Sequence, residues 1–127
     1  MTLIGKFSAG RLATCDVRLQ KLILAVAEEC DCIVTEGHRG DTEQETAFHN
    51  GVSNAMAGQS PHNASPSMAV DLVPSPLDWA DIEGFQEFRN FVEIKAQLLG
   101  IKIGPIAKFH NCKGQLVIDY PHYQLSE

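Results

Sequence analysis

The stretch MAVDLV, residues 68–73, sets one acidic side chain among apolar ones, and both the fold and the chemistry depend on how that side chain is placed. A short apolar segment that alternates and ends at Pro74-Ser75-Pro76 is typical of a β-strand. Its two faces would consist of Met68, Val70 and Leu72 and of Ala69, Asp71 and Val73. A carboxylate buried there without a partner costs several kcal/mol. The sequence therefore leaves two alternatives for Asp71: its face of the strand is solvated, or it has a partner inside the fold.

Two amphipathic helices are predicted on either side of this strand. Residues 16–30 carry apolar side chains at helical spacing, and Thr14 or Asp16 can act as the N-cap. Residues 81–99 carry a second apolar stripe, and Gly100 is a natural C-terminal stop. The two stripes consist of Leu19, Leu22, Ile23, Val26 and Ala27 and of Phe85, Phe88, Val92 and Leu99.

Shorter elements complete the predicted pattern. Strands are expected at residues 32–35, 101–103 and 116–118, and a polar helix at 42–49. Residues 51–66 are rich in Ser, Asn, Gly and Pro without an apolar period, so we expect a long loop, which in a compact domain is usually functional or disordered. Helices that alternate with short strands and irregular loops favour an α+β domain over a doubly wound sheet.

The composition limits the classes of partner. The chain of 127 residues fits one domain, since domains usually have about 100 to 200 residues. Its net charge of −6 would repel nucleic acid and anionic membranes. No apolar run approaches the roughly 18 residues that span a bilayer, and the start MTLIGKFSAG lacks the apolar core of a signal peptide. We therefore expect a monomer that is made in the cytoplasm, binds no nucleic acid and does not insert into membranes.

Four cysteines, Cys15, Cys30, Cys32 and Cys112, follow neither a CxxC nor a zinc-finger spacing. We expect them to be reduced and mostly buried thiols, with a structural disulfide as the alternative.

Two histidines and two carboxylates form the candidate reactive site. His62, Asp71 and His122 are the kind of three-ligand set with which catalytic zinc keeps its fourth position open for water. Asp119, three residues before His122, would take the proton of that water. An ideal strand would point residues 119 and 122 to opposite faces, but Pro121 interrupts the alternation. Taken singly, His62 could be a solvated loop residue and His122 a half-buried imidazole.

Three motifs carry these residues: SPH at 60–62, AVDL at 69–72 and DYPHYQL at 119–125. Together they resemble the zinc DD-peptidase family of VanY-type carboxypeptidases. Within that family, the similarity is greatest to the L-alanyl-D-glutamate peptidases of phage endolysins and bacterial wall hydrolases. The resemblance covers most of the chain and includes GHR at 37–39, residues 54–63 and Trp79.

The resemblance implies a fold and an activity. The fold would be a single zinc peptidase domain, residues 1–127, with a small antiparallel sheet and flanking helices, as in hedgehog and DD-peptidase structures. Zn²⁺ would be bound by His62, Asp71 and His122, with Asp119 as the catalytic base. Arg39 would hold the substrate or its oxyanion. The substrate would be the stem peptide of peptidoglycan, reached in the cell wall after release from the host cytoplasm.

The cleaved bond is left open between two activities. An endopeptidase would cut L-Ala from D-Glu, as the match over residues 54–62 favours, and a carboxypeptidase would release the terminal D-Ala. A third alternative is a non-catalytic binding module stabilised by zinc.

The sequence departs from the family at three positions. Eight residues separate His62 from Asp71 where the family usually has six, which should only lengthen the loop. Ile103-Gly104-Pro105 replaces a tryptophan-glycine segment and removes an aromatic wall from the expected substrate groove. His38 replaces an aromatic residue before Arg39.

Other polar and aromatic residues are assigned structural roles. We expect His38, His49 and His110 to be ordinary structural histidines, with polar contacts in the groove as the alternative. We expect Trp79 to anchor the core rather than to stack on a sugar, and Ser60 to position its loop by hydrogen bonding.

Overall fold

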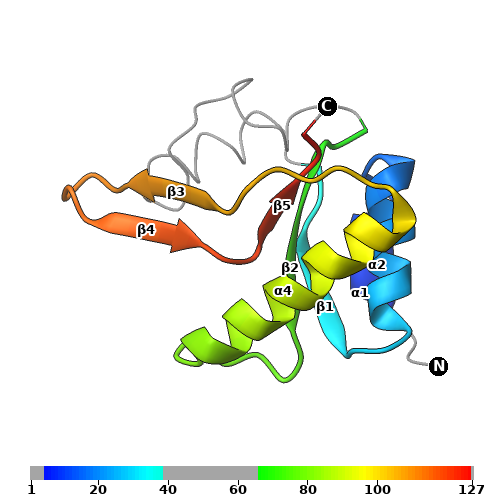
Figure 1. Cartoon of the computed structure of the whole chain (residues 1–127), viewed down its shortest axis with the longest axis horizontal. Helices are drawn as coiled ribbons and strands as arrows, with labels where there is room; N and C mark the ends of the chain where they lie inside the picture. Colours follow the sequence, from blue (N-terminus) through cyan, green and yellow to red (C-terminus); the bar gives the residue numbers. More distant parts are fainter. Residues whose placement is uncertain (1–4, 39–65, 127) are drawn as a thin grey trace.

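The computed structural model describes residues 5–38 and 66–126, shown in colour in Figure 1. In chain order the elements are α1 (Lys6–Leu12), α2 (Val17–Ala27), β1 (Cys32–Glu36), β2 (Ala69–Pro74), α4 (Ile82–Leu99), β3 (Ala107–His110), β4 (Leu116–Asp119) and β5 (His122–Gln124). The predicted helix at 42–49 and most of the predicted loop at 51–66 lie outside the described residues. None of the described helices is long and apolar enough to cross a membrane.

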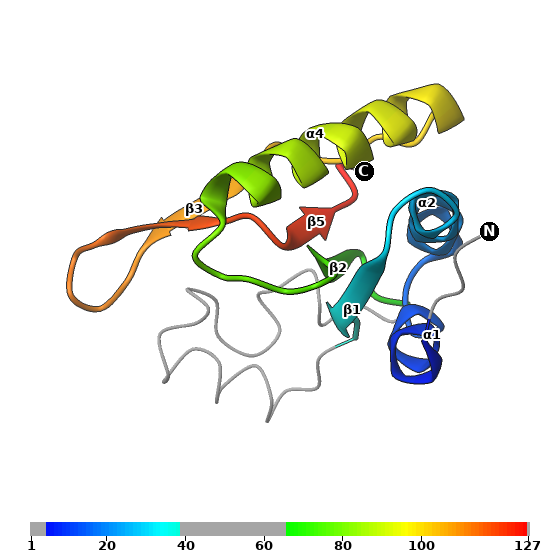
Figure 2. The ribbon, with the colours of Figure 1, turned by 90° about the horizontal axis from the view of Figure 1, so that it is seen from below.

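Two antiparallel sheets follow from these strands. The first has the order β1-β2-β5, with β2 in the centre, and the second is the β3–β4 hairpin. Figures 1 and 2 show the hairpin extending away from the three-stranded sheet, on the side opposite α1 and α2. Helix α4 contacts both α2 and β2. The arrangement confirms the predicted α+β class with a small antiparallel sheet and flanking helices.

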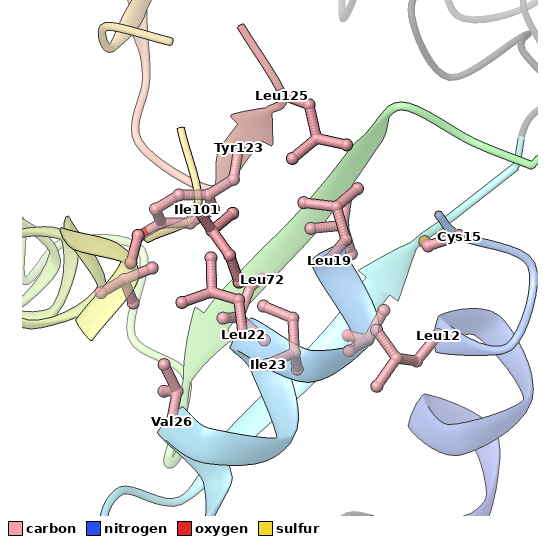
Figure 3. Packing of buried hydrophobic residues seen from close by; sticks show 14 of the residues in the cluster. Leu12, Cys15, Leu19, Leu22, Ile23, Val26, Leu72, Ile101, Tyr123 and Leu125 are labelled. Carbon is pink, nitrogen blue, oxygen red and sulfur yellow. The ribbon is translucent and has the colours of Figure 1, made fainter. Parts of the chain in front are cut away.

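The core forms between α2, α4 and the three-stranded sheet. In Figure 3, the apolar side chains of α2 gather with Leu72 of β2 and Tyr123 of β5. The predicted stripe of α2 is buried throughout, because Leu19, Leu22, Ile23 and Val26 are 0% exposed. Burial of a Leu or Ile side chain is worth about 1.5–3 kcal/mol, so this face of α2 is a main source of stability.

Both long helices begin where the sequence predicts and α4 also ends there, whereas α2 ends at Ala27, three residues before the predicted end at Cys30. The Asp16 carboxylate accepts a hydrogen bond from the backbone N–H of Arg18 at 2.9 Å and so caps α2. Thr14, the alternative cap, instead donates its hydroxyl to the carbonyl of Arg11. Gly100 ends α4 with φ 71°, a left-handed conformation that glycine adopts without strain.

Strand β2 is buried on both faces. Ala69 and Val73, the neighbours of Asp71 on its face, are 0% exposed, as are Val70 and Leu72 on the other face. The alternative in which the Asp71 face is solvated is therefore wrong, and the Asp71 carboxylate needs a partner.

Three predictions about elements and core residues are wrong or incomplete. Residues 101–103 form no strand, because Ile103 makes only an isolated bridge to Leu125. Strand β3 was not predicted, since its pairing depends on β4 across the turn at Gly114. The buried face of α4 also includes Arg89 and Ala96, while Leu99 is only partly buried.

Trp79 is 60% exposed and is not a core anchor. Its ring stacks on Phe85 with 5.4 Å between ring centroids, at an apolar pocket that is also lined by Tyr120 and Pro121.

All four cysteines are free, as predicted, but their burial varies. Cys15 is buried, Cys30 and Cys32 are half-buried against the core, and Cys112 is exposed. Burial raises the pKa of both the Cys15 and the Cys32 thiol to about 11. These two thiols are therefore protonated near neutral pH.

Candidate metal and catalytic centre

The pairing of β2 with β5 brings Asp71 opposite His122, although 51 positions separate them in the chain. Backbone hydrogen bonds join Leu72 N–H to Pro121 O, and Leu125 N–H to Met68 O, each at 2.9 Å. Because bonded pairs alternate along an antiparallel ladder, Asp71 and His122 form a non-hydrogen-bonded pair, the kind whose side chains lie closest. The register therefore provides a partner for the partly buried Asp71 carboxylate.

The His122 ring is held by a polar group at each nitrogen. Its Nδ1 lies 3.4 Å from Asp71 Oδ1, and its Nε2 lies 2.7 Å from Gln124 Oε1. The amide oxygen of Gln124 can only accept, so Nε2–H is the donor of that bond. Nδ1 then faces the Asp71 carboxylate, an arrangement that is stable only with a cation between the two atoms, either a proton or a metal ion.

This donor set fits a metal ion on geometric grounds. Two ligand atoms at about 2.0–2.1 Å from a tetrahedral zinc lie about 3.3 Å apart, which matches the observed 3.4 Å. Metal-ligating histidines usually donate their other ring N–H to a carbonyl or carboxylate, as Nε2 does here. The side chains of His122 and Asp71 are 11% and 20% exposed, so little bulk water competes for them.

The electrostatics of the site also favour positive charge. Burial of the imidazole lowers the pKa of His122, but its bonds to Asp71 and Gln124 and the negative charges of Asp71 and Asp119 together raise it above the ordinary value. A cation at Nδ1 is thus stabilised by two carboxylates.

Asp119 is the last residue of β4, and the turn at Tyr120-Pro121 leads directly to His122 in β5. The Asp119 side chain is half-buried. Asp119 and His122 belong to different sheets, so the alternation of a single strand does not apply to them. The predicted interruption at Pro121 is confirmed.

Two of the predicted site residues, His62 and Arg39, lie outside the described residues, as do His49 and Ser60. Within residues 5–38 and 66–126, no group of three His, Cys, Asp or Glu side chains could hold a metal. The structure thus brings together Asp71 and His122, and the place of His62 stays a prediction.

Two of the remaining histidines, His38 and His110, lie in the described part of the chain. His38 and His110 are exposed, and the His38 backbone N–H donates to the Thr14 hydroxyl.

Two polar residues of this region were not predicted from the sequence. Gln124 follows His122 by two positions, and alternation along β5 places both side chains on one face, which is a signal that the sequence does contain. Arg89 contacts the backbone of the same segment from α4. It stands four residues after Phe85 and three before Val92, on the buried stripe.

Comparisons with known proteins identify the family and the fold of the chain. The sequence model of the family described as phage L-alanyl-D-glutamate peptidase matches residues 2–124. No curated protein matches the chain. Among solved structures, the L-Ala D-Glu endopeptidase ChiX of Serratia marcescens matches with a TM-score of 0.76 and 22% identity, over 99% of this chain and 90% of that one. That likeness shows the same fold. Because the family model spans almost the whole sequence, the chain belongs to the phage L-alanyl-D-glutamate peptidase family, whose members are peptidases that act on peptidoglycan.

Proposed function

We propose that this peptidoglycan peptidase is a zinc enzyme in which His62, Asp71 and His122 hold Zn²⁺. The observation that carries the proposal is the pair formed by Asp71 and His122, with 3.4 Å between Oδ1 and Nδ1 and with Nε2 bonded to Gln124. A third protein ligand completes the open site typical of catalytic zinc, and His62 is the residue that the family motif supplies. Residues 1–127 would form one catalytic domain.

The residues of the chain have distinct roles in this proposal. When bound, Zn²⁺ supplies Lewis acidity and lowers the pKa of a water molecule towards about 7. Asp119 accepts the proton of the attacking water and returns it to the leaving amine. Gln124 orients the His122 ring, and Arg39 donates its planar guanidinium to the developing oxyanion or to a carboxylate of the stem peptide.

The bond that we propose is the one between L-Ala and D-Glu, in keeping with the family. A carboxypeptidase would instead leave this bond intact and release D-Ala. A zinc-stabilised binding module without activity is disfavoured, because the family consists of peptidases.

Metal analysis and one substitution test this assignment. Purified protein should contain one zinc per chain, and Asp119→Ala should retain it while hydrolysis falls by about a hundredfold or more, as expected for a missing general base. Asp31→Ala is the matched control, since Asp31 is exposed before β1. Loss of zinc from Asp119→Ala would make Asp119 a ligand instead. Absence of zinc from the wild-type protein, with none taken up on reconstitution, would overturn the proposal.

A further inference from the structure

Arg89 is the only charged residue that is fully buried in the described part of the chain, with 4% of its surface exposed. Burial of a guanidinium is costly unless its donors are satisfied, and an apolar side chain of similar volume would fill the same place on α4 at lower cost. The position therefore calls for an explanation beyond packing.

The Arg89 guanidinium bonds to backbone on both sides of the turn at Tyr120-Pro121. Its Nη1 donates to His122 O at 2.8 Å and to Tyr120 O at 3.4 Å, and its Nη2 donates to Gly104 O at 3.4 Å. Glu93, one helical turn on, places Oε2 3.3 Å from Nε. The Tyr123 ring covers the cation, with its centroid 4.5 Å from the guanidinium carbon.

The sheet topology explains why His122 needs this donor. Strand β5 is at the edge of its sheet, and the His122 carbonyl points away from β2, because the Asp71–His122 pair is not hydrogen-bonded. Further along β5, Gly104 N–H donates to Gln124 O at 2.8 Å. The next residue, Pro105, has no N–H that could donate to β5. The His122 carbonyl instead accepts its hydrogen bond from the Arg89 guanidinium.

We propose that Arg89 is a positioning residue that fixes the segment from Asp119 to His122 through its backbone carbonyls. The inference rests on the proposed function, in which one end of this segment carries the base and the other a metal ligand. A guanidinium has five donors in a rigid fork and can bridge several carbonyls at once. In this proposal Arg89 is neither a metal ligand nor a catalytic residue.

Arg89→Lys tests the fork, because it keeps the positive charge and loses the bridging geometry. The zinc affinity, measured by competition with a chelator, should fall by about tenfold, the scale seen when groups that orient metal ligands are removed. On peptidoglycan, kcat should fall by about ten- to a hundredfold with KM unchanged, since the base and ligand would be misplaced while the substrate groove stays intact. Arg18→Lys is the matched control, because Arg18 is an exposed, ion-paired arginine on α2.

A second measurement on the wild-type protein does not depend on any variant folding. The Nη protons of Arg89 should exchange with solvent far more slowly than those of Arg18 by NMR, because they are buried and bonded to carbonyls. Equal exchange rates, or an Arg89→Lys protein with wild-type zinc affinity and kcat, would overturn the inference about Arg89 alone. A wild-type protein without zinc would overturn the proposed metal site, while the kcat and exchange measurements would still decide the role of Arg89.

Discussion

Gln124→Leu should weaken zinc binding without unfolding the protein. The substitution removes the acceptor that lies 2.7 Å from His122 Nε2, in a ring that is 11% exposed. A buried N–H left without a partner costs about 1–3 kcal/mol. Loss of a partner that orients a metal-bound histidine typically costs about 10- to 100-fold in metal affinity, which is about 1.4–2.8 kcal/mol. The two values agree, so we expect the zinc dissociation constant to rise by about 10- to 100-fold.

A competition titration against a chelator of known zinc affinity measures this change. Gln124→Glu keeps an acceptor oxygen for Nε2–H and should retain most of the affinity. Gln97→Leu, an exposed glutamine on α4, is the control for the same change in side chain. If folded Gln124→Leu binds zinc as tightly as the wild type, the His122–Gln124 bond does not orient a metal ligand, and the reasoning fails.

Three further predictions concern the metal, the substrate and the thiols. Chelation of zinc should lower the melting temperature, because Asp71 and His122 would lose the ion that compensates their burial; an unchanged melting temperature would argue against it. Arg39→Lys should lower kcat/KM at least about tenfold, or 1.4 kcal/mol, and an unaffected variant would exclude Arg39 from the site. Near neutral pH a thiol reagent should label Cys112 in the folded protein but not Cys15 or Cys32, whose pKa is raised by burial to about 11. Because these two thiols ionise earlier in the unfolded chain, with a pKa near 9.0, stability should fall as the pH rises from about 9 towards 11.

The elements that the sequence predicts well are those whose signals are local. Helix α2 has a complete apolar stripe and an Asp16 cap, and β2 is a short apolar run ended by prolines. The sequence did not predict β3, and it wrongly predicted a strand at residues 101–103. Both errors have the same cause, because strand pairing depends on which partner lies alongside in the folded chain. Ile103 meets β5 only at Leu125, whereas residues 107–110 meet all of β4.

The site was predictable in its chemistry more than in its geometry. The apolar surroundings of Asp71 left open whether the carboxylate is solvated or has a partner, and only the β2–β5 register shows that it lies opposite His122. Arg89 was not predicted because a charged residue is not expected in an apolar stripe. The backbone carbonyls that accept from its two Nη atoms belong to residues 104, 120 and 122.

The cleaved bond is the most direct test of the proposed activity. Purified peptidoglycan digested with the zinc-loaded protein should yield fragments with a new free amino group on D-Glu, identified by mass spectrometry, while L-Ala keeps its link to the glycan. The same digestion after removal of zinc should yield none of these fragments. Release of free D-Ala as the main product, or equal yields with and without zinc, would contradict a zinc-dependent L-Ala–D-Glu peptidase.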